Sequence, residues 1–281
     1  MIVLRTISAA RQWVEKQRRA ASSLGLAPTM GALHEGHLSL FRLARAACDR
    51  VAVSIFVNPT QFGPGEDYER YPRPLEQDLA LAEKEGVDAV FAPDAAEMYR
   101  FGSAITLDPG PLGEVLCGAS RPGHFRGVLT VVAKLFHILQ PDRAYFGQKD
   151  AQQVILIQRM VEELNFPVRI EVGPTVRELD GLALSSRNVY LTPEQRQSAT
   201  VLYRSLRCAE EMLHRGAQDG ARLEQELQRM IREAPGAELD YARVVDRRSL
   251  EPAGHINGEV LAAVAVRFGK TRLIDNLLIA P

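Results

Sequence analysis

Residues 24–37 read LGLAPTMGALHEGH, and this stretch decides the fold class. Its apolar start, Leu24–Ala27, is typical of a buried strand, and apolar residues recur at helical spacing after the stretch. Between them lies a polar loop that places His34 and His37 at the expected start of the helix. A strand that passes through such a loop into a helix is the first half of a βαβ unit. The stretch therefore predicts an α/β fold.

The alternation of strand and helix continues as far as about residue 172. Four further short runs are predicted as strands: Val51–Val57, Ala89–Phe91, Arg143–Phe146 and Val168–Val172. Helical spacing of apolar residues lies between them, in residues 38–47, 128–139 and 154–164. Because strands joined by right-handed helical crossovers are parallel, the pattern predicts a Rossmann-like, doubly wound parallel sheet.

The pattern changes after Val176, where the chain becomes polar and loop-like. Pro193 is well placed to open one long helix toward His214, and a second helix is expected over Leu223–Glu233. Strands are expected at Leu239–Val245, Val260–Val266 and Leu273–Ile279. We therefore predict a Rossmann-like domain at 1–176 and a smaller α+β domain at 177–281, although the length also allows one large domain.

Composition excludes several classes of protein. The 34 Lys and Arg residues nearly balance the 35 Asp and Glu residues, so the formal charge of −1 provides no field for nucleic acid or an acidic membrane. The longest apolar run, Val260–Val266, is far shorter than the roughly 18 residues of a membrane helix. Cys48, Cys117 and Cys208 fit neither a disulfide framework nor a zinc knuckle. The sequence predicts a cytoplasmic protein without nucleic-acid or membrane partners.

Three common catalytic or nucleotide-binding motifs are absent from the sequence. The chain contains no G-x-x-x-x-G-K-[ST], no G-x-G-x-x-G and no G-x-S-x-G. Chemistry must therefore be sought elsewhere, in the loops that follow the strands, because ligands of open parallel sheets bind beyond the carboxyl ends of the strands.

The first of these loops carries the two histidines. Imidazole donors at a helix start add to the free backbone N–H groups there, so His34 and His37 suit a phosphate. A metal site is an alternative, but an H-x-x-H pair supplies only two ligands and no third is evident. The two residues could also be ordinary capping or surface histidines.

The second loop follows the strand that ends near residue 57. The side-chain amides of Asn58 and Gln61 could hold a ligand with hydroxyl or carboxylate groups, or Asn58-Pro59-Thr60 could be common turn chemistry. The next stretch, Gly63–Pro74, is either a mobile lid or a plain surface loop.

Two further loops offer charged and hydroxyl groups. Lys149 could bind phosphate and Asp150 a ribose hydroxyl, or they could be a solvated charge and a helix cap. Ser185, Ser186 and Arg187 could clamp a polyphosphate, or form an N-cap or turn. The four loops together favour nucleotidyl transfer.

Five segments, in order along nearly the whole chain, give the sequence a family resemblance. They are residues 28–37 (PTMGALHEGH), 56–62 (FVNPTQF), 123–128 (GHFRGV), 146–150 (FGQKD) and 185–188 (SSRN). With these segments the sequence resembles the pantoate–β-alanine ligase family, whose His-x-Gly-His element alone is shared more widely among nucleotidyltransferase-like enzymes. The resemblance implies ATP-dependent joining of pantoate to β-alanine, release of AMP and pyrophosphate, and a pantoyl-adenylate intermediate.

The resemblance also assigns roles to residues at matching positions. It implies His34, His37 and Lys149 as catalytic, phosphate-side groups. It implies an ATP site formed by Pro28, Thr29, Met30, His34, His37, Gly147, Lys149, Asp150, Val176, Ser185, Ser186 and Arg187, and a pantoate site formed by Met30, Gln61 and Gln153. Asn58, Tyr71, Arg121 and His124 match other active-site positions.

The family further implies a homodimer, and Mg²⁺ bound mainly through the phosphates of ATP. Where the family has paired acidic residues, this chain has Gln77-Asp78, which leaves Asp78 as a candidate outer-shell magnesium partner. The small C-terminal domain is expected to act as a lid that excludes water.

Two other functions remain open from the sequence. One is a nucleotidylyltransferase that transfers AMP to a phosphate-containing acceptor. The other is a nucleotide-binding regulatory or scaffold protein that has lost catalysis, although the charged site residues His34, His37, Lys149 and Arg187 are all present.

Overall fold

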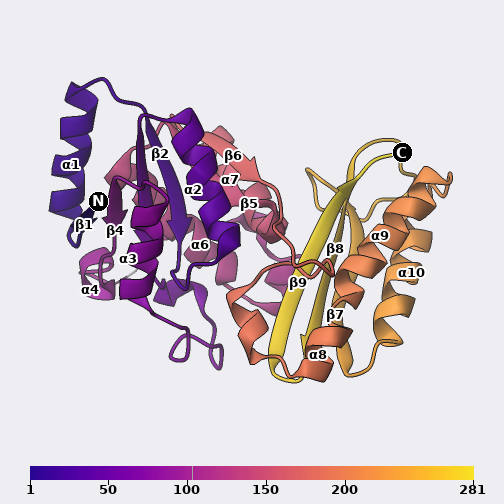
Figure 1. Ribbon diagram of the computed structural model, residues 1–281. Coiled ribbons are helices and arrows are strands. Elements are labelled where there is room, and N and C mark those ends of the chain that lie inside the picture. Colours follow the sequence, from indigo (N-terminus) through magenta and orange to yellow (C-terminus); the bar gives the residue numbers. More distant parts are fainter. Residues whose placement is uncertain (103) are drawn as a thin grey trace. The chain divides into compact units, whose positions relative to one another are not determined.

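The computed structural model describes residues 1–102 and 104–281 (Figure 1). The chain divides into two compact units. The first comprises residues 1–113, 121–147 and 156–174, and the second comprises residues 114–120, 148–155 and 175–281. The units are therefore not simply consecutive, because two short segments from the middle of the chain belong to the second unit.

The first unit contains a six-stranded sheet in the order β1-β4-β3-β2-β5-β6. All of its strand pairs are parallel. The strands are β1 (Ile2–Leu4), β2 (Leu24–Thr29), β3 (Arg50–Ile55), β4 (Ala89–Phe91), β5 (Arg143–Gly147) and β6 (Arg169–Gly173). The chain runs outward from β2 to one side of the sheet and from β5 to the other side, so the order reverses between β2 and β5. The predicted doubly wound parallel sheet is confirmed.

The clearest differences from the predicted strands are at β1 and β3. β1 was not predicted; it is a three-residue strand at the edge of the sheet and pairs only with β4. The predicted run to Val57 was too long, because β3 ends at Ile55 and Asn58 already caps a 3₁₀ turn.

The helices of the first unit connect the strands. They are α1 (Ile7–Arg19), α2 (Glu35–Ala47), α3 (Leu75–Lys84), α4 (Ala95–Met98), α6 (His124–Leu139) and α7 (Ala151–Glu163), whose first five residues group with the second unit. Helix α2 packs against α3, and α1 packs against α6. Phe41 and Ala44 of α2 lie fully buried against Val51 and Val53 of β3, where apolar faces of helix and sheet form a common core.

The second unit is built on a three-stranded antiparallel sheet, β7-β8-β9. Its strands are β7 (Ala237–Asp246), β8 (Val260–Phe268) and β9 (Thr271–Ile279), and its helices are α5 (Cys117–Ser120), α8 (Pro193–Ser198), α9 (Val201–His214) and α10 (Gly220–Arg232). Leu206, Leu223 and Leu227 of the helices pack with Val264 and Phe268 of β8 in one buried cluster. The predicted α+β character of this region is confirmed.

One helix prediction for this unit was wrong. The stretch from Pro193 to His214 is two helices, α8 and α9, rather than one long helix. Pro193 does open α8, and Thr192 with Gln195 forms the capping box there.

No helix in the described part of the chain is both long and apolar enough to cross a membrane.

Candidate active site

The sheet opens between β2 and β5 at their carboxyl ends. β2 pairs with β5 only through Gly25 and Leu26, whereas β5 stays paired with β6 as far as Gly147. Pro28 lies just beyond the end of this pairing and has no N–H to donate to a neighbouring strand. This is the place, at a reversal of strand order and beyond the carboxyl ends of the strands, where open α/β sheets bind their ligands.

The loop after β2 is folded by its own short side chains. Thr29 Oγ1 donates to the carbonyl of Ser54 at 2.8 Å and accepts from the N–H of Gly31 at 3.2 Å. Gly31 has a φ of +83°, a conformation that glycine adopts without strain, and a Cβ there would meet Asp78 Oδ2 at 2.8 Å. Glycine therefore lets the loop lie directly on the Asp78 side chain.

Asp78 of α3 binds the backbone of this loop. Its side chain is only 1% exposed, and its two oxygens accept hydrogen bonds from the N–H groups of Ala32 at 2.9 Å and Leu33 at 2.8 Å. Burial raises the pKa of the carboxyl, and these two bonds partly offset that rise. Asp78 thus fixes the residues that lead directly to His34.

His34 and His37 form the N-terminus of α2. His34 is the N-cap, and its Nδ1 accepts from the N–H of Gly36 at 3.2 Å. The Nδ1 of His37 accepts from the N–H of His34 at 3.2 Å, which completes a capping box, and the ring centroids are 4.1 Å apart. A nitrogen that accepts such a bond carries no proton, so the neutral rings carry theirs on Nε2. The capping role therefore makes both rings Nε2–H donors at the N-terminus of the helix.

The surroundings of the two histidines bear on the metal alternative. In residues 1–102 and 104–281, no three His, Cys, Asp or Glu side chains are arranged to hold a metal ion. The Nδ1 atoms are already used for capping. The arrangement suits hydrogen-bond donation rather than coordination.

The side chain of Asn58 organises the turn after β3. Its side chain is 1% exposed; Oδ1 accepts from Thr60 Oγ1 at 2.9 Å and Tyr99 OH at 2.7 Å. Its Nδ2 donates to Gln61 Oε1 at 3.1 Å and to the carbonyl of Gly127 at 3.2 Å. The oxygen and the nitrogen of the Asn58 side chain are both used in hydrogen bonds that stabilise the turn, as the turn interpretation of this loop predicts.

Gln61 and Met30 lie together in the first unit. Gln61 Nε2 points at the sulfur of Met30 at 3.1 Å, while its Oε1 is held by Asn58. Close packing of the turn against α6 depends on Gly127, where a Cβ would lie 2.3 Å from the backbone oxygen of Thr60. The geometry brings two of the residues assigned to pantoate into contact.

Arg121 and His124 tie the Gly63–Pro74 segment to the start of α6. Arg121 forms a bidentate ion pair with Glu66, at 2.8 and 2.6 Å, and lies 2.9 Å from His124 Nε2. His124 Nδ1 lies 2.8 Å from the carbonyl of Gln61. Tyr71, which is buried, packs edge-on against the Phe62 ring. The segment is thus anchored to the site by a network of hydrogen bonds.

We expect Glu66→Gln to weaken this anchor in a pH-dependent way. Burial raises the pKa of Glu66, but hydrogen bonds and charge from Arg121 outweigh it, so the folded-state pKa is lowered. Because the pKa of Glu66 is lower in the folded protein than in the unfolded chain, the ionised carboxylate stabilises the fold at pH values above the unfolded-state pKa. This stabilisation is lost as the pH falls through the folded-state pKa. Charge-assisted hydrogen bonds of this kind contribute about 1.5–3 kcal/mol.

The measurement is urea unfolding of both proteins from pH 7 to pH 3. The difference in free energy of unfolding should be largest above pH ~5 and shrink below the ordinary glutamate pKa of about 4.3. A difference that stays constant across this range would show that the carboxylate charge is irrelevant to the anchor.

The second unit carries the lysine and the serine cluster. Lys149, partly buried, lies in a 3₁₀ turn (Gln148–Asp150), with Asp150 exposed and Gln153 in the first turn of α7. Val176 accepts from the N–H of Leu184 at 3.0 Å, in a short loop that leads to Ser185. Ser185 caps the 3₁₀ turn Ser186–Tyr190 by accepting from the N–H of Arg187 at 3.2 Å. As with the histidines, the cap uses the side chain of Ser185 as an acceptor, and its hydroxyl proton can serve as a donor.

The residues predicted for the site therefore fall into two sets, one in each unit. The first unit contains Pro28, Thr29, Met30, His34, His37, Asn58, Gln61, Tyr71, Asp78, Arg121, His124 and Gly147. The second unit contains Lys149, Asp150, Gln153, Val176, Ser185, Ser186 and Arg187.

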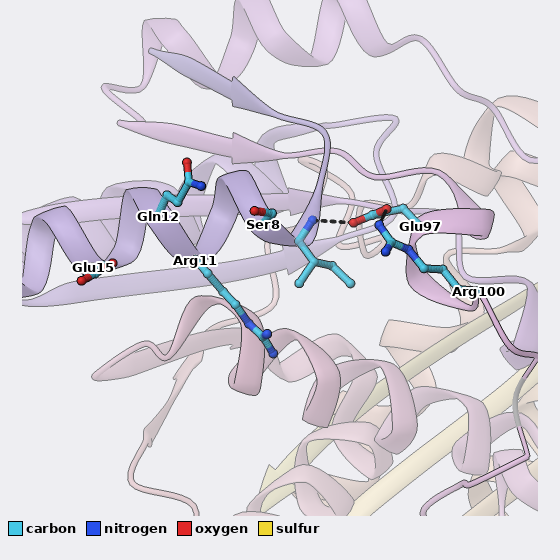
Figure 2. A pocket seen from close by; sticks show the side chains of 7 residues that line it. Ser8, Arg11, Gln12, Glu15, Glu97 and Arg100 are labelled. Carbon is cyan, nitrogen blue, oxygen red and sulfur yellow. Dashed lines mark hydrogen bonds and ion pairs between the residues drawn. The ribbon is translucent and has the colours of Figure 1, made fainter.

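A separate cavity lies at the N-terminal end of α1 (Figure 2). Its volume is about 400 Å³, and Arg11, Glu97 and Arg100 are among its lining residues. The N–H of Ile7 donates to Glu97 at 2.8 Å, and Arg100 pairs with the same carboxylate. None of the predicted site residues lines this cavity, and its charges are largely paired.

Some buried polar residues have structural roles that the sequence did not predict. The sequence suggests only a magnesium role for Asp78, whereas its side chain holds the backbone before His34. Asp275 and Asn276 are adjacent polar residues in the otherwise apolar part of β9, and this break in the strand pattern is visible in the sequence.

The fold and the histidine donors at the N-terminus of α2 define a class, an α/β enzyme with donor groups at the carboxyl ends of a parallel sheet. Comparison with known proteins is more specific. The model of the pantoate–β-alanine ligase family matches residues 2–278. The pantothenate synthetase of Moorella thermoacetica is 56% identical over 279 residues, 99% of each chain, and that of Syntrophomonas wolfei is 54% identical over 281 residues. The chain belongs to the pantoate–β-alanine ligase family.

Solved structures agree over the full length. The pantothenate synthetase of Thermus thermophilus has a TM-score of 0.95 at 48% identity, with 100% of both chains covered. A pantoate–β-alanine ligase from Francisella tularensis, crystallised with a β,γ-ATP compound and β-alanine, has a TM-score of 0.80 at 37% identity and covers 99% of this chain.

Proposed function

We propose that this protein condenses pantoate with β-alanine to form pantothenate, with ATP converted to AMP and pyrophosphate through a pantoyl adenylate. Family membership over residues 2–278 supports the reaction. The single structural observation that carries it is the paired capping of His34 and His37, which makes both rings Nε2–H donors at the helix N-terminus.

The first half-reaction needs donors more than it needs a base. The pantoate carboxylate is already ionised near neutral pH, so its oxygen attacks the α-phosphorus directly and pyrophosphate leaves. Catalysis then consists of alignment and neutralisation of phosphate charge. We assign this neutralisation to His34, His37 and Lys149, with Ser185, Ser186 and Arg187 as the triphosphate clamp.

The remaining contacts follow the same assignment. Pro28, Thr29, Met30, Gly147, Asp150 and Val176 complete the ATP site, and Met30, Gln61 and Gln153 bind pantoate. In the second half-reaction the neutral amine of β-alanine attacks the acyl carbon and AMP leaves. We assign its orientation to the region of Tyr71, Arg121 and His124, and we propose that positioning rather than a dedicated base dominates this step.

Mg²⁺ is proposed to reach the protein as the ATP complex, bound by phosphate oxygens. The outer-shell magnesium role considered for Asp78 does not fit its surroundings, because both carboxylate oxygens already accept backbone N–H groups and the side chain is buried.

Asp78→Asn tests this assignment of Asp78. An amide NH₂ in place of one oxygen faces a backbone N–H, so we expect unfolding to become easier by about 1–3 kcal/mol. The Mg²⁺ concentration that gives half-maximal rate should stay within twofold of the original value. A stable variant that needs at least about tenfold more Mg²⁺ would instead make Asp78 a magnesium partner.

We further propose that residues 177–281 act as a lid, that the protein is a homodimer, and that it works in the cytoplasm. Such a lid would exclude water, which otherwise hydrolyses an acyl adenylate. The three free thiols, Cys48, Cys117 and Cys208, suit a reducing compartment. Light scattering of the purified protein tests the dimer.

The decisive test of the reaction is exchange of labelled pyrophosphate into ATP. Exchange should require pantoate and should not require β-alanine, and pantothenate should form only when all three substrates are present. Exchange that depends on a phosphate-containing acceptor would favour a nucleotidylyltransferase. ATP binding without AMP production from any acid and amine would favour a regulatory protein.

A further inference from the structure

Two buried polar residues interrupt the outer strand of the small sheet. Asp275 and Asn276 lie next to each other in β9, where the neighbouring residues are apolar, and they are 2% and 3% exposed. β9 pairs with β8 on one side only, and apart from α9 it is contacted by two short turns, Gln148–Asp150 and Ser186–Tyr190. Buried polar groups need partners, so the position of these two side chains calls for an explanation.

Asn276 binds the turn that carries Lys149. Its Nδ2 donates to the carbonyl of Gln148 at 3.0 Å and to the carbonyl of Lys149 at 2.9 Å. Its Oδ1 accepts from Gln148 Nε2 at 2.9 Å. One amide thus uses both hydrogens and its oxygen on two consecutive residues of a three-residue turn. These bonds fix the backbone on which the Lys149 side chain is mounted.

Asp275 binds the start of the segment that leads to the serine cluster. Its carboxylate pairs with Arg177 in bidentate geometry, at 2.6 and 2.9 Å. Arg177 also donates to the carbonyl of Gly181 at 3.0 Å and lies over the Tyr203 ring at 4.0 Å. The loop closed in this way runs directly into Ser185.

We propose that Asp275 and Asn276 are positioning residues for ATP. From one strand, Asp275 positions the loop that leads to the Ser185–Arg187 cluster, and Asn276 positions the turn that carries Lys149. The inference rests on the proposed function, because it takes these residues as phosphate contacts. Two segments of the chain are held by one strand, β9, and displacement of reacting groups by about 1 Å can cost on the order of 10²-fold in rate. Asp275 and Asn276 thus fix the position of Lys149 relative to the Ser185–Arg187 cluster.

The test compares Asn276→Ala with the control Asn257→Ala, which changes an exposed asparagine in the same unit. Calorimetry measures the Kd of ATP with Mg²⁺ in the absence of pantoate, and separately the Kd of pantoate alone. We expect the Kd of ATP to rise at least tenfold in Asn276→Ala, while the Kd of pantoate and both constants of the control stay within twofold.

A second variant, Asn276→Asp, adds a pH signature. The carboxylate cannot donate to two carbonyls, but its protonated form donates one hydrogen bond, and burial disfavours the charged form. We expect kcat/KM for ATP, relative to the original protein, to rise as pH falls from 8 to 5.5. The same ratio for Asn276→Ala should remain flat.

The outcomes separate this inference from the reaction. If the original protein makes pantothenate but Asn276→Ala binds ATP within twofold of normal, the positioning role is wrong. It is also wrong if pantoate binding weakens as much as ATP binding, or if both Asn276 variants fail to fold, because the pair would then serve stability. If the original protein makes no pantothenate, the proposed reaction fails, whatever the ATP affinities show.

Discussion

His34→Asn is expected to keep α2 capped and to slow pantoyl-adenylate formation by about 10²–10³-fold, the usual effect of removing one donor that stabilises developing charge. Asparagine is a favoured N-cap whose oxygen can replace Nδ1 as the acceptor for Gly36, but it has no equivalent of Nε2–H. The substitution therefore separates the two uses of the ring.

His37→Gln gives the matching test at the other ring. Glutamine at this third helical position is an ordinary partner in a capping box, so its oxygen can accept from the N–H of His34. With its oxygen held by the cap, the amide NH₂ of glutamine does not point along the direction of the imidazole Nε2–H, so we expect a loss of rate similar to that of His34→Asn.

Pantoate-dependent exchange of pyrophosphate measures the rate of both variants, and thermal unfolding measures the cap. His214→Asn, at an exposed position near the end of α9, is the control and should change neither value. If the folded histidine variants exchange within threefold of the original rate, both residues are capping residues and nothing more.

Lys149→Gln is expected to lower kcat/KM for ATP by about 10²–10³-fold, because it removes the fixed positive charge assigned to the phosphates. The turn itself should survive, since Asn276 holds its backbone carbonyls and not the lysine side chain. Loss of activity with an unchanged melting temperature is therefore the expected combination.

Lys270→Gln removes the same charge from the exposed turn between β8 and β9 and serves as the control. A similar loss of kcat/KM in both lysine variants would point to a general effect of net charge. Measurement at two salt concentrations adds to the comparison, because long-range effects between exposed charges are screened by salt.

Short apolar runs in the sequence were enough to find five of the six parallel strands, including β4, which has only three residues. Helical spacing of apolar residues predicted α2, α6 and α7, but α1 and α3 were not predicted. β1, an equally short strand at the edge of the sheet, was not predicted, and the break between α8 and α9 escaped because Ala199 and Thr200 keep helical backbone angles. A break in a helix that involves no Gly or Pro is hard to predict from the sequence, because the spacing of apolar residues continues across it.

Site residues were predicted less completely than strands. The loops after β2 and β5 could be chosen because ligands bind at the carboxyl ends of parallel strands, and this needs only the order of elements. Which side chains are already occupied could not be known. Asn58, offered as a ligand contact, has its amide fully engaged by Thr60, Tyr99, Gln61 and Gly127.

The sequence by itself determined the α/β class, the order of strands and helices, and the family, because these depend on spacing and on short motifs along the chain. Only the tertiary structure decided that the histidines cap α2 through Nδ1, that Asp78 supports the loop before them, and that Asn276 binds the turn of Lys149 from more than a hundred residues away. Hydrogen bonds depend on distance in space and on which donors and acceptors meet there, and neither is written in the order of residues.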